Sequence, residues 1–223
     1  MKKLVILTGA GMSAESGITT FRDSGGLWEQ YRIEDVATPE AWSRDPKFVL
    51  DFYNARRAQL ERSEPNQGHI GLAELEKQFD VQIITQNVDN LHERAGSSKV
   101  LHLHGELTKV CDAYKREVID IGYREVKMGE KLGNTQMRPF IVWFGEAVPT
   151  MDEAIRLTQD ADVFVVIGSS LNVYPAAGLI NYVQRGVPIY LIDPKEVVTN
   201  MKVEFIQKGA SEGVKELVKR LTL

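Results

Sequence analysis

The chain has 223 residues, of which 43% are hydrophobic and 26% are charged, a composition typical of a folded globular domain. Its net charge is −4, and no lysine- or arginine-rich run is long enough to suggest a surface that follows a nucleic-acid backbone, so we expect no nucleic-acid partner. The apolar run at 4–7 is too short for a signal peptide, and no run approaches the roughly 18 residues of a membrane span. We therefore expect a cytoplasmic, monomeric protein with no membrane partner.

Short apolar runs bounded by turn residues recur along the chain and predict buried strands. In chain order they are KLVILTGAG, VQIITQNVD, VLHLHGE, FIVWFGE, DVFVVIGSS and PIYLIDP. Helical patterns lie between them at 46–62, 70–78, 151–160, 176–185 and 212–221. Because the runs are continuously apolar, they favour strands covered on both faces, as in a parallel sheet. The alternation of strands and helices predicts an α/β fold, a Rossmann-like doubly wound parallel sheet.

Two stretches depart from this alternation. Residues 27–62 are more than one crossover helix requires, and residues 107–138 are polar and contain no convincing buried strand. We expect these insertions to form a small domain beside a large Rossmann-like domain made of residues 1–26, 63–106 and 139–223. Together they would make a single catalytic domain over residues 1–223, with a cleft where a ligand can bind.

A glycine-rich turn at 9–11 directly follows the first predicted strand. Glycines at a strand-to-helix turn let the backbone come close to a pyrophosphate. The spacing is not the GxGxxG of ordinary dehydrogenases, and a tight turn without a ligand is an equal alternative. The polar continuation at 13–28 indicates a loop that could fold over a ligand, with Phe21 and Arg22 as candidate covers.

The segment Gln86-Asn87-Val88-Asp89 lies at the carboxyl end of the predicted strand VQIIT. Ligands bind at that edge of parallel sheets, and amide and carboxylate groups suit ribose hydroxyls and a carboxamide. Asp89 or Asn90 could instead simply cap the next helix, and the pattern leaves both alternatives open.

A third polar turn, Gly168-Ser169-Ser170, follows the apolar strand DVFVVI. Its hydroxyls and backbone amides could bind a phosphate or a ribose, although a plain turn fits as well. Three polar turns thus follow three predicted parallel strands, and this convergence favours a nucleotide-type ligand.

The segment LHLHGE contains His102 and His104, which strand alternation places on one face. If the strand ends near His104, that residue reaches the cleft, and a histidine of near-neutral pKa is a natural general base. The pair could instead bind a metal, but no third ligand stands at a recognisable spacing, and a purely structural histidine is common.

Five motifs in order resemble the sirtuins, the NAD-dependent protein lysine deacylases: GAGMSAESGITTFR, TQNVDNLHERAG, HLHGEL, RPFIVWFGE and GSSLNVYPAAGL. The similarity covers nearly the whole chain, apart from about 111–137. It implies that NAD is consumed as co-substrate, that acyl-lysine proteins or peptides are the partners, and that nicotinamide, O-acyl-ADP-ribose and free lysine are the products. A mono-ADP-ribosyltransferase or NAD glycohydrolase with the same pocket is the alternative, because both cleave the same first bond.

The resemblance also implies roles for individual residues. The acyl-lysine oxygen would attack the anomeric carbon of the nicotinamide ribose, and His104 would then deprotonate a ribose hydroxyl, with Asn87 and Asp89 at the same catalytic centre. The implied NAD-binding residues are Gly9, Ala10, Gly11, Ser13, Ala14, Glu15, Thr20, Phe21, Arg22, Trp28, Gln86, Asn87, Val88, Asp89, Gly168, Ser169, Ser170, Asp193 and Ala210. The implied substrate channel is formed by Val142, Phe144 and Gly145, along which the peptide would pair as an added strand.

Tyr53 and Arg56 match the Tyr-x-x-Arg pair of class III sirtuins, which accept succinyl- and malonyl-lysine. At i and i+3 on a helix, the two side chains project from one face. Arg56 can hold a carboxylate with two parallel hydrogen bonds, and Tyr53 can add a third donor. Without the family pattern, an amphipathic helix with a core tyrosine and a solvated arginine would be favoured.

Two features depart from the family. Most sirtuins hold a structural zinc with two Cys-x-x-Cys pairs, but Cys111 is the only cysteine here, and one thiolate with scattered carboxylates is not a tetrahedral site. We therefore expect no metal and a small domain held by apolar packing. The residues expected in that packing are Val118, Ile119, Ile121, Tyr123 and Val126. Leu191 stands where many relatives carry an asparagine near the adenosine ribose, and Asp193 could substitute for it.

Overall fold

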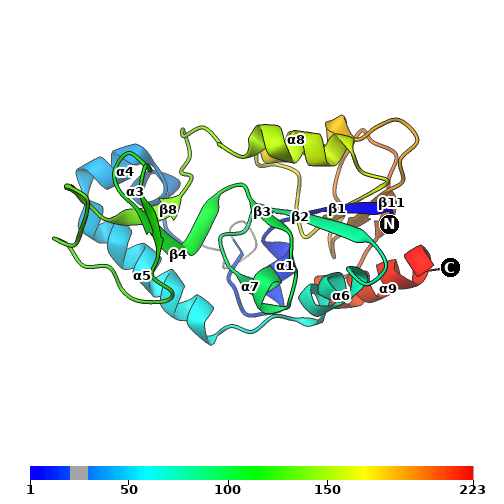
Figure 1. Cartoon of the computed structure of the whole chain (residues 1–223), viewed down its shortest axis with the longest axis horizontal. Helices are drawn as coiled ribbons and strands as arrows, with labels where there is room; N and C mark the ends of the chain where they lie inside the picture. The colour runs from blue at the N-terminus through cyan, green and yellow to red at the C-terminus, as the bar shows by residue number, and fades with distance from the viewer. Residues whose placement is uncertain (21–29, 223) are drawn as a thin grey trace.

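The computed structural model describes residues 1–20 and 30–222, and its larger sheet has six parallel strands (Figure 1). In chain order these strands are β1 (Lys3–Thr8), β2 (Asp80–Thr85), β3 (Val100–His102), β9 (Val163–Ile167), β10 (Ile189–Ile192) and β11 (Glu204–Ile206). Their order in the sheet is β11-β10-β9-β1-β2-β3, so the order reverses next to β1. This arrangement confirms the predicted doubly wound, Rossmann-like α/β class.

Helices cover both faces of this sheet, and α8 lies on the opposite face from α6 and α9 in Figure 1. Their bounds are α6 (Gln67–Leu75), α8 (Met151–Gln159) and α9 (Ala210–Thr222), and the 3₁₀ helix η1 (Ala176–Tyr182) packs with α8. In β1, Leu4 and Ile6 belong to one core cluster, whereas Val5 and Leu7 belong to the other. Both faces of the strand are therefore buried, which explains the unbroken apolar run. No helix among the described residues is long and apolar enough to cross a membrane.

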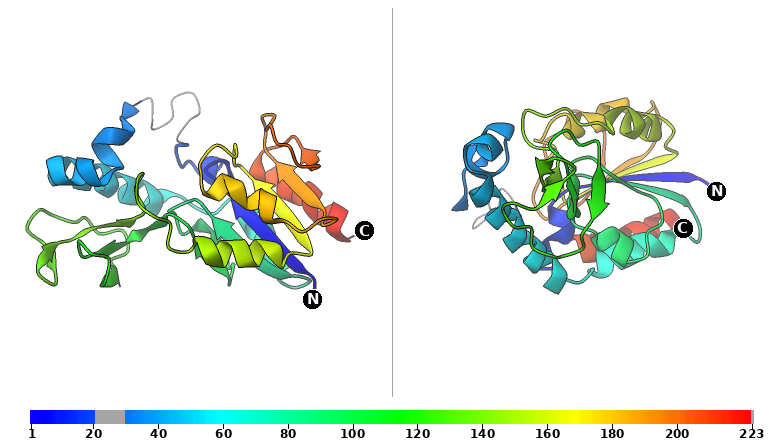
Figure 2. Two further views of the ribbon diagram at one scale, coloured as in Figure 1. Left: turned by 90° about the horizontal axis from the view of Figure 1, so that it is seen from above. Right: turned by 60° about the vertical axis from the view of Figure 1, so that its left-hand side comes forward.

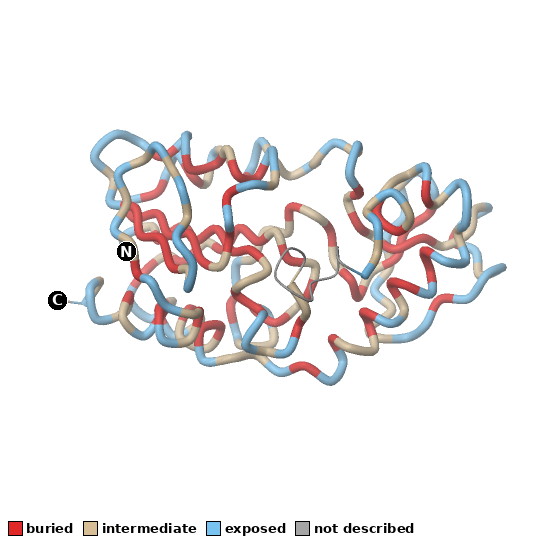
Figure 3. The backbone as a smooth tube through the Cα atoms, turned by 180° about the vertical axis from the view of Figure 1, so that it is seen from behind, coloured by how far each residue is buried: buried red, intermediate tan, exposed pale blue. Residues whose placement is uncertain are grey.

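A second group of elements lies at the far end of the molecule from the two termini (Figure 2). Its helices are α3 (Ile33–Val36), α4 (Pro39–Arg44) and α5 (Pro46–Arg62). Its antiparallel sheet has the order β5-β4-β8, with β4 (Gly105–Cys111), β5 (Val118–Asp120) and β8 (Arg138–Ile141), and β6 (Lys131–Leu132) pairs with β7 (Thr135–Gln136). In Figure 3 the buried residues, drawn in red, gather mainly at the end of the molecule that carries the termini and the six-stranded sheet. A smaller set of buried residues lies in this second group of elements.

Two expectations about these strands are wrong. The apolar run at 140–144 predicted another parallel strand, but β8 pairs antiparallel with β4. The segment 107–138 was expected to contain no buried strand, yet Val110 and Cys111 in β4 are fully buried. The register between β4 and β8 shifts between Gly105 and Val110, and such an irregularity breaks the alternation by which a half-buried strand is identified in a sequence.

The apolar packing of this second group agrees in part with the set of packing residues expected from the sequence. Val126 is buried with Leu50 and Val110, and Ile119 and Ile121 pack against them. Val118 is wrongly predicted, since it is 40% exposed. It precedes Ile119 in β5, and successive side chains of a strand point to opposite faces.

Helix α5 has the predicted bounds, Pro46–Arg62. The Asp45 side chain accepts a hydrogen bond from the backbone N–H of Phe48, and proline stands in the first turn, so the helix begins with both a cap and a preset φ. Its buried face consists of Val49, Leu50, Phe52, Tyr53, Arg56, Arg57 and Leu60. The helix therefore presents Tyr53 and Arg56 to the interior.

Gly105 connects the two sheets and tolerates no larger residue. Its φ is +83°, and an added Cβ would lie 2.0 Å from the carbonyl oxygen of Phe140. We expect Gly105→Ala to lower the free energy of unfolding by about 3 kcal/mol, because strain and a backbone clash add. Gly186→Ala is the control, since its φ is +91° with nothing within 4 Å, and about 1 kcal/mol is expected there. Urea denaturation measures both, and equal losses would contradict the clash.

Candidate active site

The three polar turns meet at the carboxyl edge of the parallel sheet. They follow β1, β2 and β9, which are neighbours in the sheet. The Asn87 side chain donates to the carbonyl of Gly9 over 3.0 Å, and the Gln86 side chain donates to the hydroxyl of Ser169 over 3.0 Å. Segments far apart in the sequence are thus joined by direct hydrogen bonds.

Glycines allow the first and third turns to touch. A Cβ on Gly11 would lie 2.7 Å from the Cα of Gly168, and a Cβ on Gly9 would lie 2.7 Å from its carbonyl oxygen. Gly168 itself has a φ of +62°, a conformation that favours glycine. Turn-to-turn packing therefore requires these glycines, a reason that the motif alone did not reveal.

A buried polar network joins the first two turns. Ser13, in the short helix α1 (Gly11–Ala14), donates its hydroxyl hydrogen to Asp89 over 2.9 Å and accepts from the Asn87 amide over 3.2 Å. The other Asp89 oxygen accepts the N–H of Leu91, the first residue of α7 (Leu91–Arg94), while the N-cap position of this helix is held by Asn90 without a side-chain cap hydrogen bond. Burial raises the pKa of Asp89, and these two hydrogen bonds oppose the shift.

Two buried histidines behind this network were not predicted. His69 accepts the N–H of Asn66 at Nδ1, so its Nε2–H points to the Ser13 hydroxyl at 3.5 Å. His92 lies with Nε2 3.1 Å from the hydroxyl of Thr8. Burial lowers the pKa of His69 to about 4 and that of His92 well below its ordinary value, so both rings are neutral. His92 lies within the TQNVDNLHERAG motif, but no spacing in the sequence marks either histidine as part of this network.

His104 follows β3 and lies beside the second turn. Its Nδ1 is 3.0 Å from the carbonyl oxygen of Gln86. A carbonyl only accepts, so Nδ1 carries the hydrogen and Nε2 presents a lone pair. Burial lowers the pKa of His104, and the bond to Gln86 opposes part of this shift. A neutral imidazole with a free Nε2 lone pair is what a general base requires.

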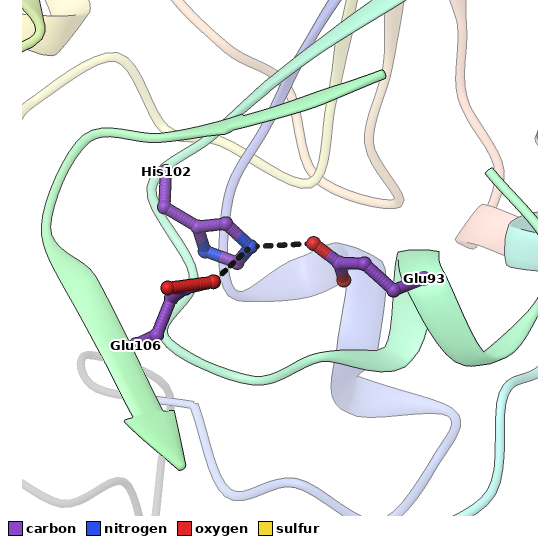
Figure 4. Close-up of side chains that lie close together, drawn as sticks. All are labelled: Glu93, His102 and Glu106. Atoms are coloured by element: carbon purple, nitrogen blue, oxygen red, sulfur yellow. Dashed lines mark hydrogen bonds and ion pairs between the residues drawn. The ribbon is translucent and has the colours of Figure 1, made fainter. Parts of the chain in front are cut away.

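His102 has a different environment, shown in Figure 4. Its Nδ1 lies 3.0 Å from the carbonyl oxygen of Asn87, and its Nε2 lies 2.8 Å from Glu93 and 3.8 Å from Glu106. Burial alone would lower its pKa, but the hydrogen bond and charge of Glu93 outweigh burial and raise it. No third metal ligand stands at a recognisable spacing in the sequence, whereas in the fold Glu93 of α7 and Glu106, four residues after His102, both approach its Nε2. Lys109 pairs with Glu106, so the two carboxylates face a lysine and the His102 imidazole.

A small cavity opens between α5 and the first two turns. Its lining residues are Ala10, Ser13, Ile18, Thr19, Arg56, Leu60, Asn87, Val88, Asp89 and Leu107. Arg56 is only 7% exposed, which contradicts the alternative of a solvated arginine. Burial lowers its pKa, and the charge of Asp89 is among the influences that oppose this. Tyr53 is buried beside it and accepts the indole N–H of Trp143 over 3.0 Å.

The segment after β8 runs beside the backbone of His104. The N–H of Val142 donates to the carbonyl of His104 over 2.9 Å. Phe144 is 41% exposed, and Gly145, with a φ of +89°, follows it. Trp143 between them is buried, and the guanidinium of Arg138 lies 3.6 Å from the centre of its ring. Neither Trp143 nor Arg138 was singled out from the sequence.

The remaining residues predicted to bind NAD have no hydrogen bond to the three turns among those described above, or lie outside the described residues. Glu15 accepts the N–H of Ser211 over 3.2 Å, Ala210 is buried in the core, and Asp193 follows β10 and accepts the N–H of Lys195. Ala14 and Ser170 are exposed, and Thr20 is half-buried. Phe21, Arg22 and Trp28 lie outside the described residues.

Comparison with known proteins decides the family, because residues 9–175 match the model of the Sir2 family. The chain belongs to the Sir2 family. A relative from Bacteroides thetaiotaomicron, named NAD-dependent protein deacylase, is 63% identical over 97% of both chains. A relative of the same name from Helicobacter pylori is 50% identical over 99% of this chain and 98% of its own. A solved structure of a Sir2 homologue with NAD superposes on this Sir2 protein with a TM-score of 0.90 at 41% identity, covering 99% and 90% of the two chains.

Proposed function

We propose that this Sir2 protein is an NAD-dependent protein lysine deacylase that consumes NAD and acts on acyl-lysine proteins or peptides. The observation that carries the proposal is His104, whose Nδ1–H donates to the Gln86 carbonyl of the second polar turn, so that Nε2 is the basic atom of the ring. The names of the close relatives and the NAD complex of the solved homologue support it. The products would be nicotinamide, O-acyl-ADP-ribose and free lysine.

The residues at this edge fit NAD. Asn87 and Asp89 are each 5% exposed and line the cavity, where an amide and a carboxylate can hold a carboxamide and ribose hydroxyls. Bound NAD would supply an electrophilic ribose carbon and accept the acyl group. The proposed peptide channel is formed by Val142, Phe144 and Gly145. The proposed NAD-binding residues are those that the sequence indicates: Gly9, Ala10, Gly11, Ser13, Ala14, Glu15, Thr20, Phe21, Arg22, Trp28, Gln86, Asn87, Val88, Asp89, Gly168, Ser169, Ser170, Asp193 and Ala210.

His104 would act as the general base. The Gln86 carbonyl fixes the ring in the tautomer that leaves Nε2 free, and Nε2 would accept the proton of a ribose hydroxyl. The lowered pKa keeps the ring unprotonated at neutral pH. No protein nucleophile is required, because the substrate oxygen and the ribose hydroxyl form the new bonds.

We also propose that negatively charged acyl groups are substrates. Arg56 lies in the cavity wall, where burial strengthens a charge-assisted hydrogen bond to a succinyl or malonyl carboxylate. The Tyr53 oxygen accepts from Trp143, so its own hydrogen can be donated to the same carboxylate. Both side chains come from one face of α5.

A peptide panel tests the proposed function. The wild-type protein is incubated with NAD and acetyl-, succinyl-, malonyl- or unmodified-lysine peptides, and the products are identified by mass spectrometry. We expect nicotinamide and O-acyl-ADP-ribose only with acylated peptides. Equal NAD loss without peptide would indicate a glycohydrolase, and ADP-ribose attached to protein would indicate a mono-ADP-ribosyltransferase.

We further propose that the protein lacks the structural zinc of most sirtuins. Burial raises the pKa of the Cys111 thiol to about 11, and its hydrogen points to the Pro139 carbonyl. The neighbouring Asp112 accepts the N–H groups of Arg116 and Glu117, so its carboxylate is engaged in a turn. Elemental analysis of the purified protein is expected to find far less than one zinc per chain, and chelator treatment should leave the melting temperature unchanged. Stoichiometric zinc would contradict the proposal.

The organisation of the chain completes the proposal. We propose a single catalytic domain with the large and small parts predicted from the sequence, acting as a cytoplasmic monomer. Light scattering after gel filtration tests the oligomeric state.

A further inference from the structure

His102 has no part in the proposed chemistry, yet it contacts the turn that carries Asn87 and Asp89. Its Nδ1 lies 3.0 Å from the Asn87 carbonyl oxygen, and its Nε2 lies 2.8 Å from the carboxylate of Glu93. We propose that His102 is a positioning residue, which fixes the backbone of the 86–89 turn and thereby the side chains that recognise NAD. The inference rests on the proposed function.

The contact occurs where the parallel ladder ends. Thr85 and His102 are the last register partners of β2 and β3, and the N–H of Leu103 donates to the Thr85 carbonyl. Beyond Thr85, the carbonyls of Gln86 and Asn87 accept from imidazole nitrogens, those of His104 and His102. Two histidines, two residues apart, thus continue the ladder with side-chain donors and satisfy backbone groups that the neighbouring strand no longer serves.

The His102 ring is itself held from elements outside the turn. Glu93 belongs to α7 and Glu106 to β4, and the His102 side chain is only 9% exposed between them (Figure 4). Lys109, also on β4, forms an ion pair with the Glu106 carboxylate. An imidazole fixed at both nitrogens is a rigid support for the Asn87 backbone.

A shift of that backbone would reach the NAD site directly. The Asn87 side chain donates to the carbonyl of Gly9 and to the hydroxyl of Ser13, which joins the first two turns. Asp89 follows two residues later and accepts from Ser13 as well. A displacement of about 1 Å in such a site costs on the order of 100-fold in rate.

Three substitutions at His102 separate positioning from simple space filling. The amide nitrogen of asparagine occupies the place of Nδ1, so His102→Asn retains the donor to Asn87, whereas glutamine replaces Nε2 and loses this donor. We expect His102→Gln and His102→Ala to lower kcat/KM for NAD by about 10- to 100-fold and to weaken NAD binding in calorimetry. His102→Asn should stay within about threefold of wild type, and KM for the peptide should change little in all three.

Thr150→Val is the matched control, because Thr150 donates to the backbone carbonyl of His102 over 3.1 Å without touching Asn87. Thr150→Val should leave kcat/KM for NAD and the affinity for NAD unchanged. Thermal melts show whether every variant is folded. Wild-type NAD affinity in His102→Gln, or equal losses in all three His102 variants, would overturn the inference. If the wild type deacylates no peptide, only the proposed function is overturned. The NAD affinities of the His102 variants still test whether His102 positions the 86–89 turn.

Discussion

Replacing His104 with alanine is expected to lower the rate of deacylation by about 10²- to 10⁴-fold, the contribution typical of a general base. The Nε2 lone pair, set by the hydrogen bond from Nδ1–H to the Gln86 carbonyl, would be lost with the ring. The earlier cleavage of NAD does not need this base, so exchange of labelled nicotinamide into NAD should continue in the presence of acyl peptide. Loss of exchange together with deacylation, in a folded variant, would contradict the assignment.

The pH dependence of the wild-type reaction gives an independent check on His104. A general base acts unprotonated, so the rate falls as the pH drops through its pKa. Burial lowers the pKa of His104 below the ordinary value of 6.5, so the free base persists to lower pH than for an exposed histidine. We therefore expect the acid limb of kcat/KM to have its midpoint below pH 6.5. A midpoint above that value would assign the limb to another group.

Replacing Arg56 with methionine is expected to lower kcat/KM for succinyl-lysine by about 100-fold, while that for acetyl-lysine stays within about threefold. Methionine is similar in length and suits a buried site, so the change mainly removes the guanidinium that would hold the acyl carboxylate. An acetyl group has no such carboxylate and loses nothing by the change. Steady-state kinetics with the two peptides measure both values.

The neighbouring Arg57 supplies a matched control for this experiment. It is also buried on α5, but it donates to the carbonyl of Leu107 and to the side chain of Asn54 rather than lining the cavity. Arg57→Met should lower the melting temperature and leave the ratio of the two activities unchanged. Equal loss of both activities in Arg56→Met, or a changed ratio in Arg57→Met, would show that Arg56 does not read the acyl carboxylate.

Local patterns in the sequence determined much of this fold. The unbroken apolar runs of β1 and β9 predicted strands covered on both faces, and both faces are buried. The helical pattern at 46–62 predicted α5, and the start of this helix is set locally, because the Asp45 side chain caps it and Pro46 presets φ. The gathering of the three polar turns was also predictable, since the carboxyl ends of parallel strands lie at one edge.

Other features were decided only by contacts between distant segments. Apolar periodicity reports that a residue is buried but not which strand it pairs with, so β8 was predicted as parallel and is antiparallel to β4. Val118 was predicted to be buried and is exposed, because only the central residue of the short β5 turns toward the core, and even that residue is half-buried. No spacing rule indicated that His69 and His92 lie behind Ser13 and Thr8, since these pairs are 56 and 84 residues apart.

The two histidines of LHLHGE show the division most clearly. The sequence placed both on one face of a strand and indicated a general base at His104, because residue type and alternation are local properties. The opposite directions of their pKa shifts came only from the tertiary structure, which sets His104 against a backbone carbonyl in a buried place and brings Glu93 to His102. A pKa depends on the charges and burial around a group, and both are fixed by how distant parts of the chain pack together.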